Sequence, residues 1–295
     1  MSEMTKKVHS MLVRFVPGVR SLLDRGSAGW MILVGTIIVV SMIAMTLLGP
    51  FIAPHDPVAP GVGPRLSSPS SAFPFGTTRL GEDMLSRVLT GGGIMLQVAG
   101  LSALICFAIG VPIGLFSSYV GGKVDKILSL IMDSIYAFPG LVLAIALAAM
   151  LGRGVVSISV AISVVYIPSY FRIVRSQVLT IKELQYTAAA EAAGARWHTI
   201  IFSHILPNVI PSIVVVASVN FADAILTAAG LTFVGLGVEV DVPDWGRDLT
   251  NGRQVLGSGA WWVITFPGLM IILLAFGFTL VGEGLSELTS PKLMK

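Results

Sequence analysis

The chain has 295 residues, of which 54% are hydrophobic and only 12% are charged. Soluble globular domains carry about 25% charged residues, so this composition excludes a soluble protein and predicts an integral membrane protein. The formal net charge of +3 says little, because the distribution of Lys and Arg among segments carries the information. A single cysteine, Cys106, excludes an intrachain disulfide.

The N-terminal segment 1–29 is basic, with Lys6, Lys7 and three arginines, and an uncharged run follows at 30–51. At 1.5 Å per residue this run is long enough to cross about 30 Å of hydrocarbon. A secretory signal has a shorter apolar region and a small-residue cleavage site. We therefore expect a retained first transmembrane helix, preceded by a segment outside the membrane.

The segment 51–91 is expected to lie outside the membrane, and the prolines from Pro50 to Pro74 predict irregular structure up to about residue 75. Prolines remove backbone donors, and lipid cannot satisfy the backbone groups that are left over. His55 stands beside Asp56, but two residues do not make a metal site.

Five further apolar runs predict five more transmembrane helices. They cover approximately residues 88–122, 127–151, 155–170, 210–237 and 261–281. Gly110 and Gly114 in the second helix allow close approach of a neighbouring helix. Asp133 in the third is either an interfacial anchor or a mechanistic residue, because carboxylates inside membranes are expensive.

A polar island separates the fourth and fifth spans. Five alanines between Ala188 and Ala193 favour a short helix, and Gly194 is suited to end it. A second helical segment then follows, with an apolar stripe that is able to lie on the membrane surface; the stripe consists of Trp197, Ile200, Ile201 and Ile205. We expect Pro207 and Pro211 to mark the end of this segment. The all-small first helix is shaped to enter a cleft of another protein.

The positions of Lys and Arg orient the chain. Segments on the side of the N-terminus hold 13 of the 19 Lys and Arg residues, and the opposite segments hold 6. Because positive residues collect on the cytosolic side, both termini and the island are expected in the cytosol of a multi-pass plasma-membrane protein.

Catalytic and metal motifs are missing from the sequence. It has no G-x-x-x-x-G-K-[ST] loop, so the chain is not expected to hydrolyse ATP by itself. It also lacks H-E-x-x-H, paired cysteines and G-x-S-x-G. We therefore expect no catalytic residue, no metal ligand and no cofactor in this chain.

Several motifs resemble those of a known family. The run from Tyr186 to Asn208 resembles the E-A-A…G…L-P segment of bacterial and archaeal ABC-importer permeases, in its dipeptide, oligopeptide and nickel branch. The family's leading glutamate is replaced by Ala188, which leaves Glu191 as the only acid there. The run 75–87 follows the family pattern F-G-T-x-x-x-G-x-D-x-x-S-R, whereas the tail is a weakened form of the family's C-terminal motif.

The resemblance implies an all-α, six-helix permease of the type I ABC-importer architecture. Its domain would cover residues 30–295, with an extracytoplasmic segment at 51–91 and a cytosolic coupling loop at 171–206. The implied partners are membrane lipid, a second homologous permease, two cytosolic ATPases that bind ATP and Mg, and an extracytoplasmic substrate-binding protein. Nucleic acid is not among them. The ATPase-coupling residues would be Tyr186, Ala188, Ala189, Ala190, Glu191, Ala192, Gly194, His204, Leu206 and Pro207.

The implied solute is a dipeptide or oligopeptide, and nickel, glutathione and oligosaccharides remain alternatives within the family. A stand-alone ion-coupled carrier is an alternative of another class, and it would need membrane acids such as Asp133 and Asp223. Asn220 and Asp223 are three residues apart and therefore share one face of the fifth helix. We expect this face to line the translocation path, or else to bond to the second permease.

Overall fold

The computed structural model describes residues 25–238 and 242–289, and this part of the chain is helical without a β-strand. The expected all-α membrane architecture is confirmed. Five long apolar helices are able to span a membrane: α3 (Ser27–Ile52), α5 (Gly92–Val120), α8 (Val155–Lys182), α11 (Leu206–Phe233) and α13 (Trp262–Thr289). A sixth span exists if the bent pair α6 (Gly122–Tyr136) and α7 (Gly140–Leu151) is counted as one.

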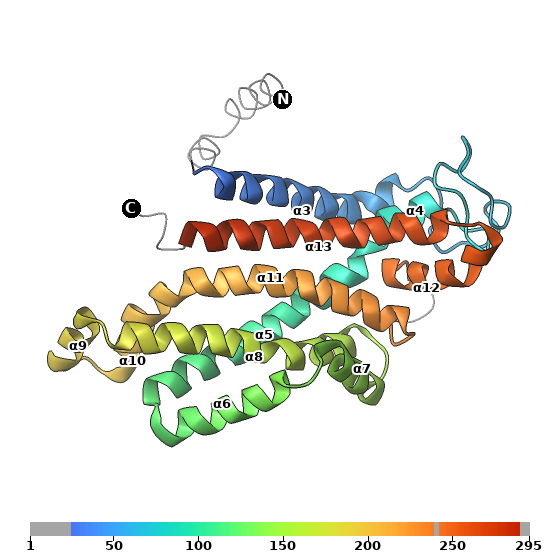
Figure 1. Ribbon diagram of the computed structural model, residues 1–295. Coiled ribbons are helices and arrows are strands. Elements are labelled where there is room, and N and C mark those ends of the chain that lie inside the picture. Colours follow the sequence, from blue (N-terminus) through green and yellow to red (C-terminus); the bar gives the residue numbers. More distant parts are fainter. Residues whose placement is uncertain (1–24, 239–241, 290–295) are drawn as a thin grey trace.

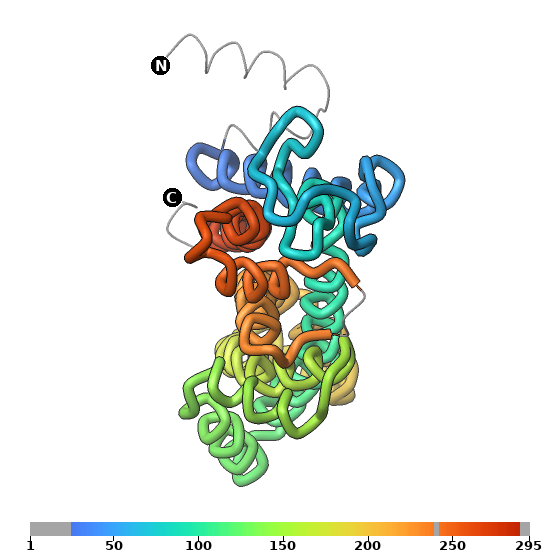
Figure 2. Tube along the Cα trace, turned by 90° about the vertical axis from the view of Figure 1, so that its right-hand side faces the viewer, coloured from blue at the N-terminus to red at the C-terminus, as the bar shows by residue number. Residues whose placement is uncertain are grey.

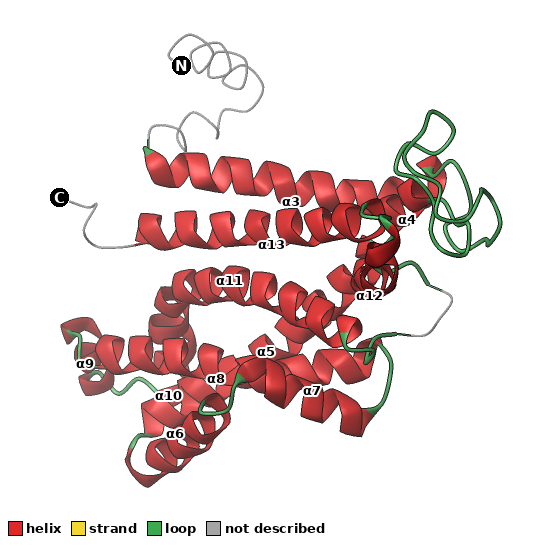
Figure 3. Cartoon of the chain, turned by 45° about the vertical axis from the view of Figure 1, so that its right-hand side comes forward, coloured by secondary structure: helices red, strands yellow, loops and turns green. Residues whose placement is uncertain are grey.

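The helices lie side by side in one bundle (Figure 1). Helices α3 and α13 form one edge, α11, α8 and α5 form the middle, and α6 and α7 form the other edge, as the end view also shows (Figure 2). The short helices α9 (Gln185–Ala192) and α10 (Trp197–Thr199) lie at one end, here called the α9 end. The opposite end, the α12 end, carries α4 (Met84–Thr90), α12 (Trp245–Val255) and the loop 53–83 (Figure 3).

The interface between α5 and α8 is built from small residues at intervals of four. On α5 these are Ser102, Cys106, Gly110, Gly114 and Ser118. A Cβ atom on Gly110 would come within 2.8 Å of the Tyr170 Cβ, and one on Gly114 within 2.9 Å of the Val174 Cβ. The two backbones therefore approach closely, as the glycines predicted.

Hydroxyl groups extend the same interface. Ser102 Oγ donates to the Ser159 carbonyl at 3.2 Å, and Ser163 Oγ donates to the Ser102 carbonyl at 3.3 Å. Each hydroxyl also donates to a carbonyl one turn earlier in its own helix, at 2.6–2.7 Å. Because lipid offers no hydrogen-bond partners, these bonds satisfy the serines inside the bundle.

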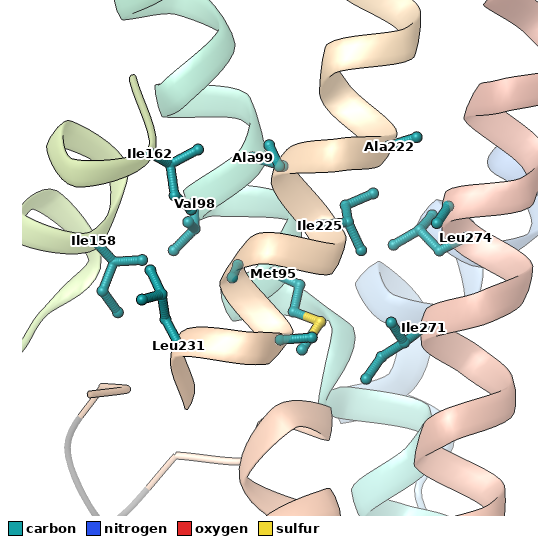
Figure 4. Close-up of a cluster of buried hydrophobic side chains, with 14 of the residues drawn as sticks. Met95, Val98, Ala99, Ile158, Ile162, Ala222, Ile225, Leu231, Ile271 and Leu274 are labelled. Atoms are coloured by element: carbon teal, nitrogen blue, oxygen red, sulfur yellow. The ribbon is translucent and has the colours of Figure 1, made fainter. Parts of the chain in front are cut away.

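The main apolar core lies where α5, α8, α11 and α13 meet, nearer the α12 end (Figure 4). Ile225 and Leu231 on α11 contact this core from the middle of the bundle, and both are fully buried. Large apolar side chains also point away from the protein on α3 and α5, including Leu47, Leu104 and Phe107. Hydrocarbon is the expected environment for such faces.

The structure corrects three expectations about the helices. The third span is not one straight helix, because it bends by 91° at Ala137–Pro139, where Pro139 stands directly before α7. The fourth span does not end near residue 170: α8 continues to Lys182, so residues 171–182 belong to a helix rather than to the loop. Helix α12 was not expected, since the segment 237–260 lacks a long apolar run. The basic segment 1–29 lies mostly outside the described residues.

The α5–α8 interface generates a stability prediction. Gly114→Ala places a methyl group against α8, which should destabilise the fold by about 1–3 kcal/mol through overpacking. Gly100→Ala is a matched control on the same helix, because nothing lies within 4 Å of its Cβ position. We expect a thermal midpoint several degrees lower for the first variant and unchanged or slightly higher for the second, measured on purified protein in detergent. Equal midpoints would contradict the packing account.

Candidate functional site

The predicted island forms a short exposed helix at the α9 end. In α9 the side chains of Ala188, Ala189, Glu191 and Ala192 are exposed, whereas Ala190 is half-buried. Gly194 has a φ of +84°, a conformation that favours glycine, and its N–H donates to the Glu191 carbonyl at 2.9 Å. The expected helix and glycine stop are both present.

Helix α9 is fixed to α8 by a hydrogen bond from its first turn, and the end of α8 is in turn bonded to α5. Thr187 is buried, and its Oγ1 donates to the Ile181 carbonyl of α8 at 3.0 Å. Lys182 Nζ donates to the Tyr119 carbonyl at the end of α5, at 2.7 Å. A force applied to α9 therefore reaches α8 directly and α5 through α8.

Tyr186 connects α9 to the start of α11. Asn208 Nδ2 donates to the Tyr186 hydroxyl at 3.4 Å and to the His204 carbonyl at 2.6 Å. The Tyr186 and His204 rings lie with their centroids 6.5 Å apart. Two of the predicted coupling residues, Tyr186 and His204, are thus brought together by Asn208, while Leu206 packs against a cluster of buried apolar residues and Pro207 is exposed.

The second island segment differs from the expectation. Ile200, Ile201 and Ile205 do not lie on the membrane surface but are buried between α5, α8 and α11. Only Trp197 remains half-exposed, with its ring edge-on to Phe116 at 5.7 Å. Burial against α8 was not visible in the sequence, because an apolar stripe fits a lipid surface and a protein surface equally well.

The chain continues from this second segment into α11 without a break. Residues 200–205 form a π-helix that runs directly into α11, and Pro207 and Pro211 do not end it. Pro207 lies in the first turn of α11, where a missing N–H is tolerated. Single π-helical turns occur often at functional sites.

A second site lies at the bend of the third span. A pocket of about 320 Å³, here called the break pocket, is bounded by the end of α6, the start of α7, α8 and α11. Its walls include Tyr136, Phe138, Gly140, Tyr166, Ser169, Asn220 and Asp223. The structure therefore places the predicted pair, Asn220 and Asp223, in one pocket. No pattern in the sequence indicated that the bend would form the opposite wall of this pocket.

Asp133 has a partner outside the pocket. Arg172 Nη2 on α8 lies 2.8 Å from the Asp133 carboxylate, and the guanidinium stacks 4.1 Å from the centroid of the Tyr136 ring. One turn further along α8, Arg175 forms a bidentate pair with Asp125 at 2.6–2.8 Å. These two ion pairs connect α6 to α8, and the pair formed by Asp133 is exposed.

A buried charge cluster at the α12 end was missed by sequence reasoning. Arg87 on α4 is almost fully buried, and it pairs with Asp248 on α12 at 2.7 Å and with Glu82 at 2.8 Å. It also donates to the Pro57 carbonyl at 2.9 Å. A single guanidinium thus joins α4, α12 and the proline-rich loop. Asp248 lies in no recognised motif, so nothing pointed to it.

Next to this cluster, Asp244 begins α12 by accepting the Gly246 N–H at 3.0 Å. Burial raises the pKa of Asp244 from 3.8 to about 6, although the Gly246 N–H, Thr232 and Arg247 act in the opposite direction. Asp248 raises it further.

The His55 ring lies 3.4 Å from the Asp83 carboxylate, and the described residues contain no group of three potential metal ligands.

Comparison with known proteins gives consistent matches. Residues 110–295 match the family described as the binding-protein-dependent transport system inner membrane component. A dipeptide transport system permease protein of Alkalihalophilus pseudofirmus is 37% identical over 88% of this chain and 86% of its own length. A probable D,D-dipeptide transport system permease protein of Escherichia coli is 41% identical over 87% and 86%. A glutathione transport system permease protein of Pectobacterium atrosepticum is 38% identical over 86% and 85%.

A solved structure shares the fold. A chain of the methionine ABC transporter MetNI in an inward-facing conformation has a TM-score of 0.55 and 19% identity, covering 70% of this chain and 98% of its own. At this identity the likeness concerns the fold alone.

The shifted pKa of Asp244 generates a pH prediction. The folded state binds this proton more tightly than the unfolded state, so ionisation destabilises the fold above pH 6 by up to about 3 kcal/mol. The effect decreases as the pH falls towards 4. Asp244→Asn stays neutral and can keep the helix cap. We therefore expect this variant to raise the thermal midpoint about three times as much at pH 8 as at pH 4.5.

Asp56→Asn is the matched control, because it removes an exposed carboxylate at the same end of the molecule. It should change the midpoint little at either pH. A stabilisation by Asp244→Asn that is equal at both pH values would contradict the ionisation account.

Proposed function

We propose a function from one premise: this chain belongs to the family of binding-protein-dependent transport system inner membrane components. It is then the permease subunit of an ABC importer and conducts a solute through the plasma membrane. The observation that carries the mechanism is α9, whose exposed alanines lie on a helix that is hydrogen-bonded to α8 and to α11.

The partners follow from the same premise. A binding-protein-dependent system needs a substrate-binding protein and an ATPase besides its membrane component. We infer a second homologous permease and two ATPase subunits in the assembly, with ATP and Mg bound by the ATPases. This chain contributes no catalytic residue to that scheme; its part is to convert ATPase movement into helix movement.

The substrate we propose is a short peptide. The relatives are named for transport of dipeptides, D,D-dipeptides and glutathione, and all three solutes are small molecules with peptide bonds. Nickel and oligosaccharides are alternatives for which none of these three relatives is named. A stand-alone carrier is disfavoured because Asp133 is held by Arg172, which leaves Asp223 as the remaining candidate acid.

The coupling segment receives the ATPase. The small side chains of Ala188, Ala189 and Ala192 allow a close-fitting groove to approach the α9 backbone, and Glu191 offers a charge to a basic residue there. Movement of α9 pulls on α8 through Thr187 and on α11 through Tyr186 and Asn208. Helices α8 and α11 both border the break pocket, so the same movement reshapes the path we propose for the solute.

The orientation we propose places the α9 end in the cytosol, where the positive residues collect. Ser68 is exposed in the loop at the α12 end, and Thr180 is exposed near the α9 end of α8. With Ser68→Cys in sealed cells, an impermeant thiol reagent should react from outside. With Thr180→Cys it should react only after permeabilisation; the native Cys106 is buried and serves as background. Labelling of both sites from outside would refute the orientation.

The coupling role predicts an effect of bulk on α9. Ala189→Trp should obstruct the ATPase groove without disturbing the bundle, because this side chain is exposed. We expect import to fall at least tenfold, which corresponds to about 1.4 kcal/mol of lost coupling, and the ATPase to be released or to hydrolyse ATP without solute control. The measurements are import, ATP hydrolysis and ATPase retention in purified complexes.

Ala72→Trp is the matched control, since Ala72 is exposed in the loop at the opposite end. It should retain the ATPase at the wild-type level. If Ala189→Trp imported solute normally, α9 would be an ordinary loop element and the proposed mechanism would fail.

A further inference from the structure

The carboxylate of Asp223 has no partner in the described part of the chain. The ion pairs found there involve other acids, and no hydrogen bond reaches this side chain. Asp223 is half-buried, ten residues before the end of the apolar helix α11. A carboxylate inside a membrane costs about 2.5–3.5 kcal/mol, and such residues normally face a cavity and pair with a cation. A cation from outside this chain would complete the site.

Asn220 gives a second, independent indication. Its side chain is 8% exposed, lines the same pocket, and its Nδ2 has no hydrogen-bond partner within the described residues. A buried donor without a partner costs about 1–3 kcal/mol. The pocket therefore lacks an acceptor near Asn220 as well as a cation near Asp223, and the two residues share one helix face.

The surrounding charges leave the pocket electronegative. Arg172 contacts the pocket wall through the Tyr136 ring, but its guanidinium is bound to Asp133. Tyr166 OH is hydrogen-bonded to Thr227 Oγ1 at 2.9 Å, which fixes it as part of the wall. Ser169 adds a hydroxyl to the lining, and neither Ser169 nor Tyr166 supplies a positive charge.

The size of the pocket limits what it holds. Its volume of about 320 Å³ is at the lower end of ligand sites, which run from about 300 to 1,000 Å³. It therefore accommodates one residue of a solute and not a long chain. The pocket needs a cation near Asp223 and a hydrogen-bond acceptor near Asn220. The first residue of a peptide supplies both, because its α-ammonium group is a cation and its carbonyl group lies two bonds away.

We propose that the break pocket is a subsite for the amino-terminal residue of a peptide during translocation. The Asp223 carboxylate pairs with the α-ammonium group, and Asn220 Nδ2 donates to the first peptide carbonyl. This inference rests on the proposed transport function and adds to it the part of the solute that the permease recognises. It selects solutes with a free amino terminus.

The first test measures the charge preference of the pocket in the assembled complex. Ser169→Cys places a thiol in the pocket wall while leaving Asn220 and Asp223 intact. The probes are methanethiosulfonate reagents carrying a trimethylammonium or a sulfonate group, with rates normalised to a free thiol in solution. We expect the cationic reagent to react at least tenfold faster. Adding Asp223→Asn should reduce the ratio to about twofold or less, whereas Glu283→Gln, an exposed acid on α13, should leave it unchanged.

The second test measures recognition. Glycylglycine should protect the Ser169→Cys thiol from the cationic reagent, and N-acetylglycylglycine should not; omitting the binding protein removes its own selectivity from the result. Asp223→Asn should lower glycylglycine import at least tenfold in an assembled complex, with unchanged affinity of the binding protein for the dipeptide.

The contrary outcomes separate the inference from the proposed function. A reactive thiol without charge preference, or equal protection by both dipeptides, overturns the subsite while the pocket remains in the path. Loss of assembly in Asp223→Asn shows that the partner cation belongs to the second permease, which also overturns it. A thiol that never reacts, together with normal import by Ala189→Trp, counts against the proposed function itself.

Discussion

The close approach of α5 and α8 is the constraint on which the rest of the structure depends. Lipid offers little hydrophobic driving force between helices, so the contact relies on close packing of small residues and on hydrogen bonds between serines. Gly110 and Gly114 permit it sterically, and Ser102 and Ser163 bond across it. Helix α8, once fixed in this way, carries Tyr166 and Ser169 into the break pocket and Arg172 and Arg175 against α6.

The two ends of the bundle are held by different means. At the α12 end, Arg87 joins α4, α12 and the proline-rich loop through buried charges, which are costly to break because a charge without its partner would remain inside. At the α9 end, α9 is held by hydrogen bonds of Thr187 to α8 and of the exposed Asn208 to Tyr186, and the exposed Lys182 bonds α8 to α5. Exposed bonds contribute less and rearrange more easily. The α12 end is therefore the more firmly held of the two, and the α9 end carries the segment that we propose the ATPase moves.

The bend of the third span forms one wall of the break pocket, which we propose as part of the solute path. A helix that crosses the membrane without a break offers only side chains to its neighbours, whereas the bend at Pro139 opens a pocket beside α8 and α11. Non-helical backbone at this depth is tolerated where it is buried in protein or borders a cavity. The break pocket, the paired Arg172 and the unpaired Asp223 thus form one arrangement, in which α9 is connected to the pocket through α8 and α11.

Local chemistry in the sequence determined the helical class, the apolar spans, the non-spanning proline-rich segment and the short helix that stops at Gly194. Each follows from properties of neighbouring residues: apolar length, missing backbone donors, alanine propensity and the positive φ that glycine allows. Only the tertiary structure decided that Ile200, Ile201 and Ile205 face protein instead of lipid, that α8 runs on to Lys182 and that Asp248 meets Arg87. These depend on contacts between residues up to 161 positions apart, and an apolar or charged side chain does not reveal by itself which distant surface it will meet.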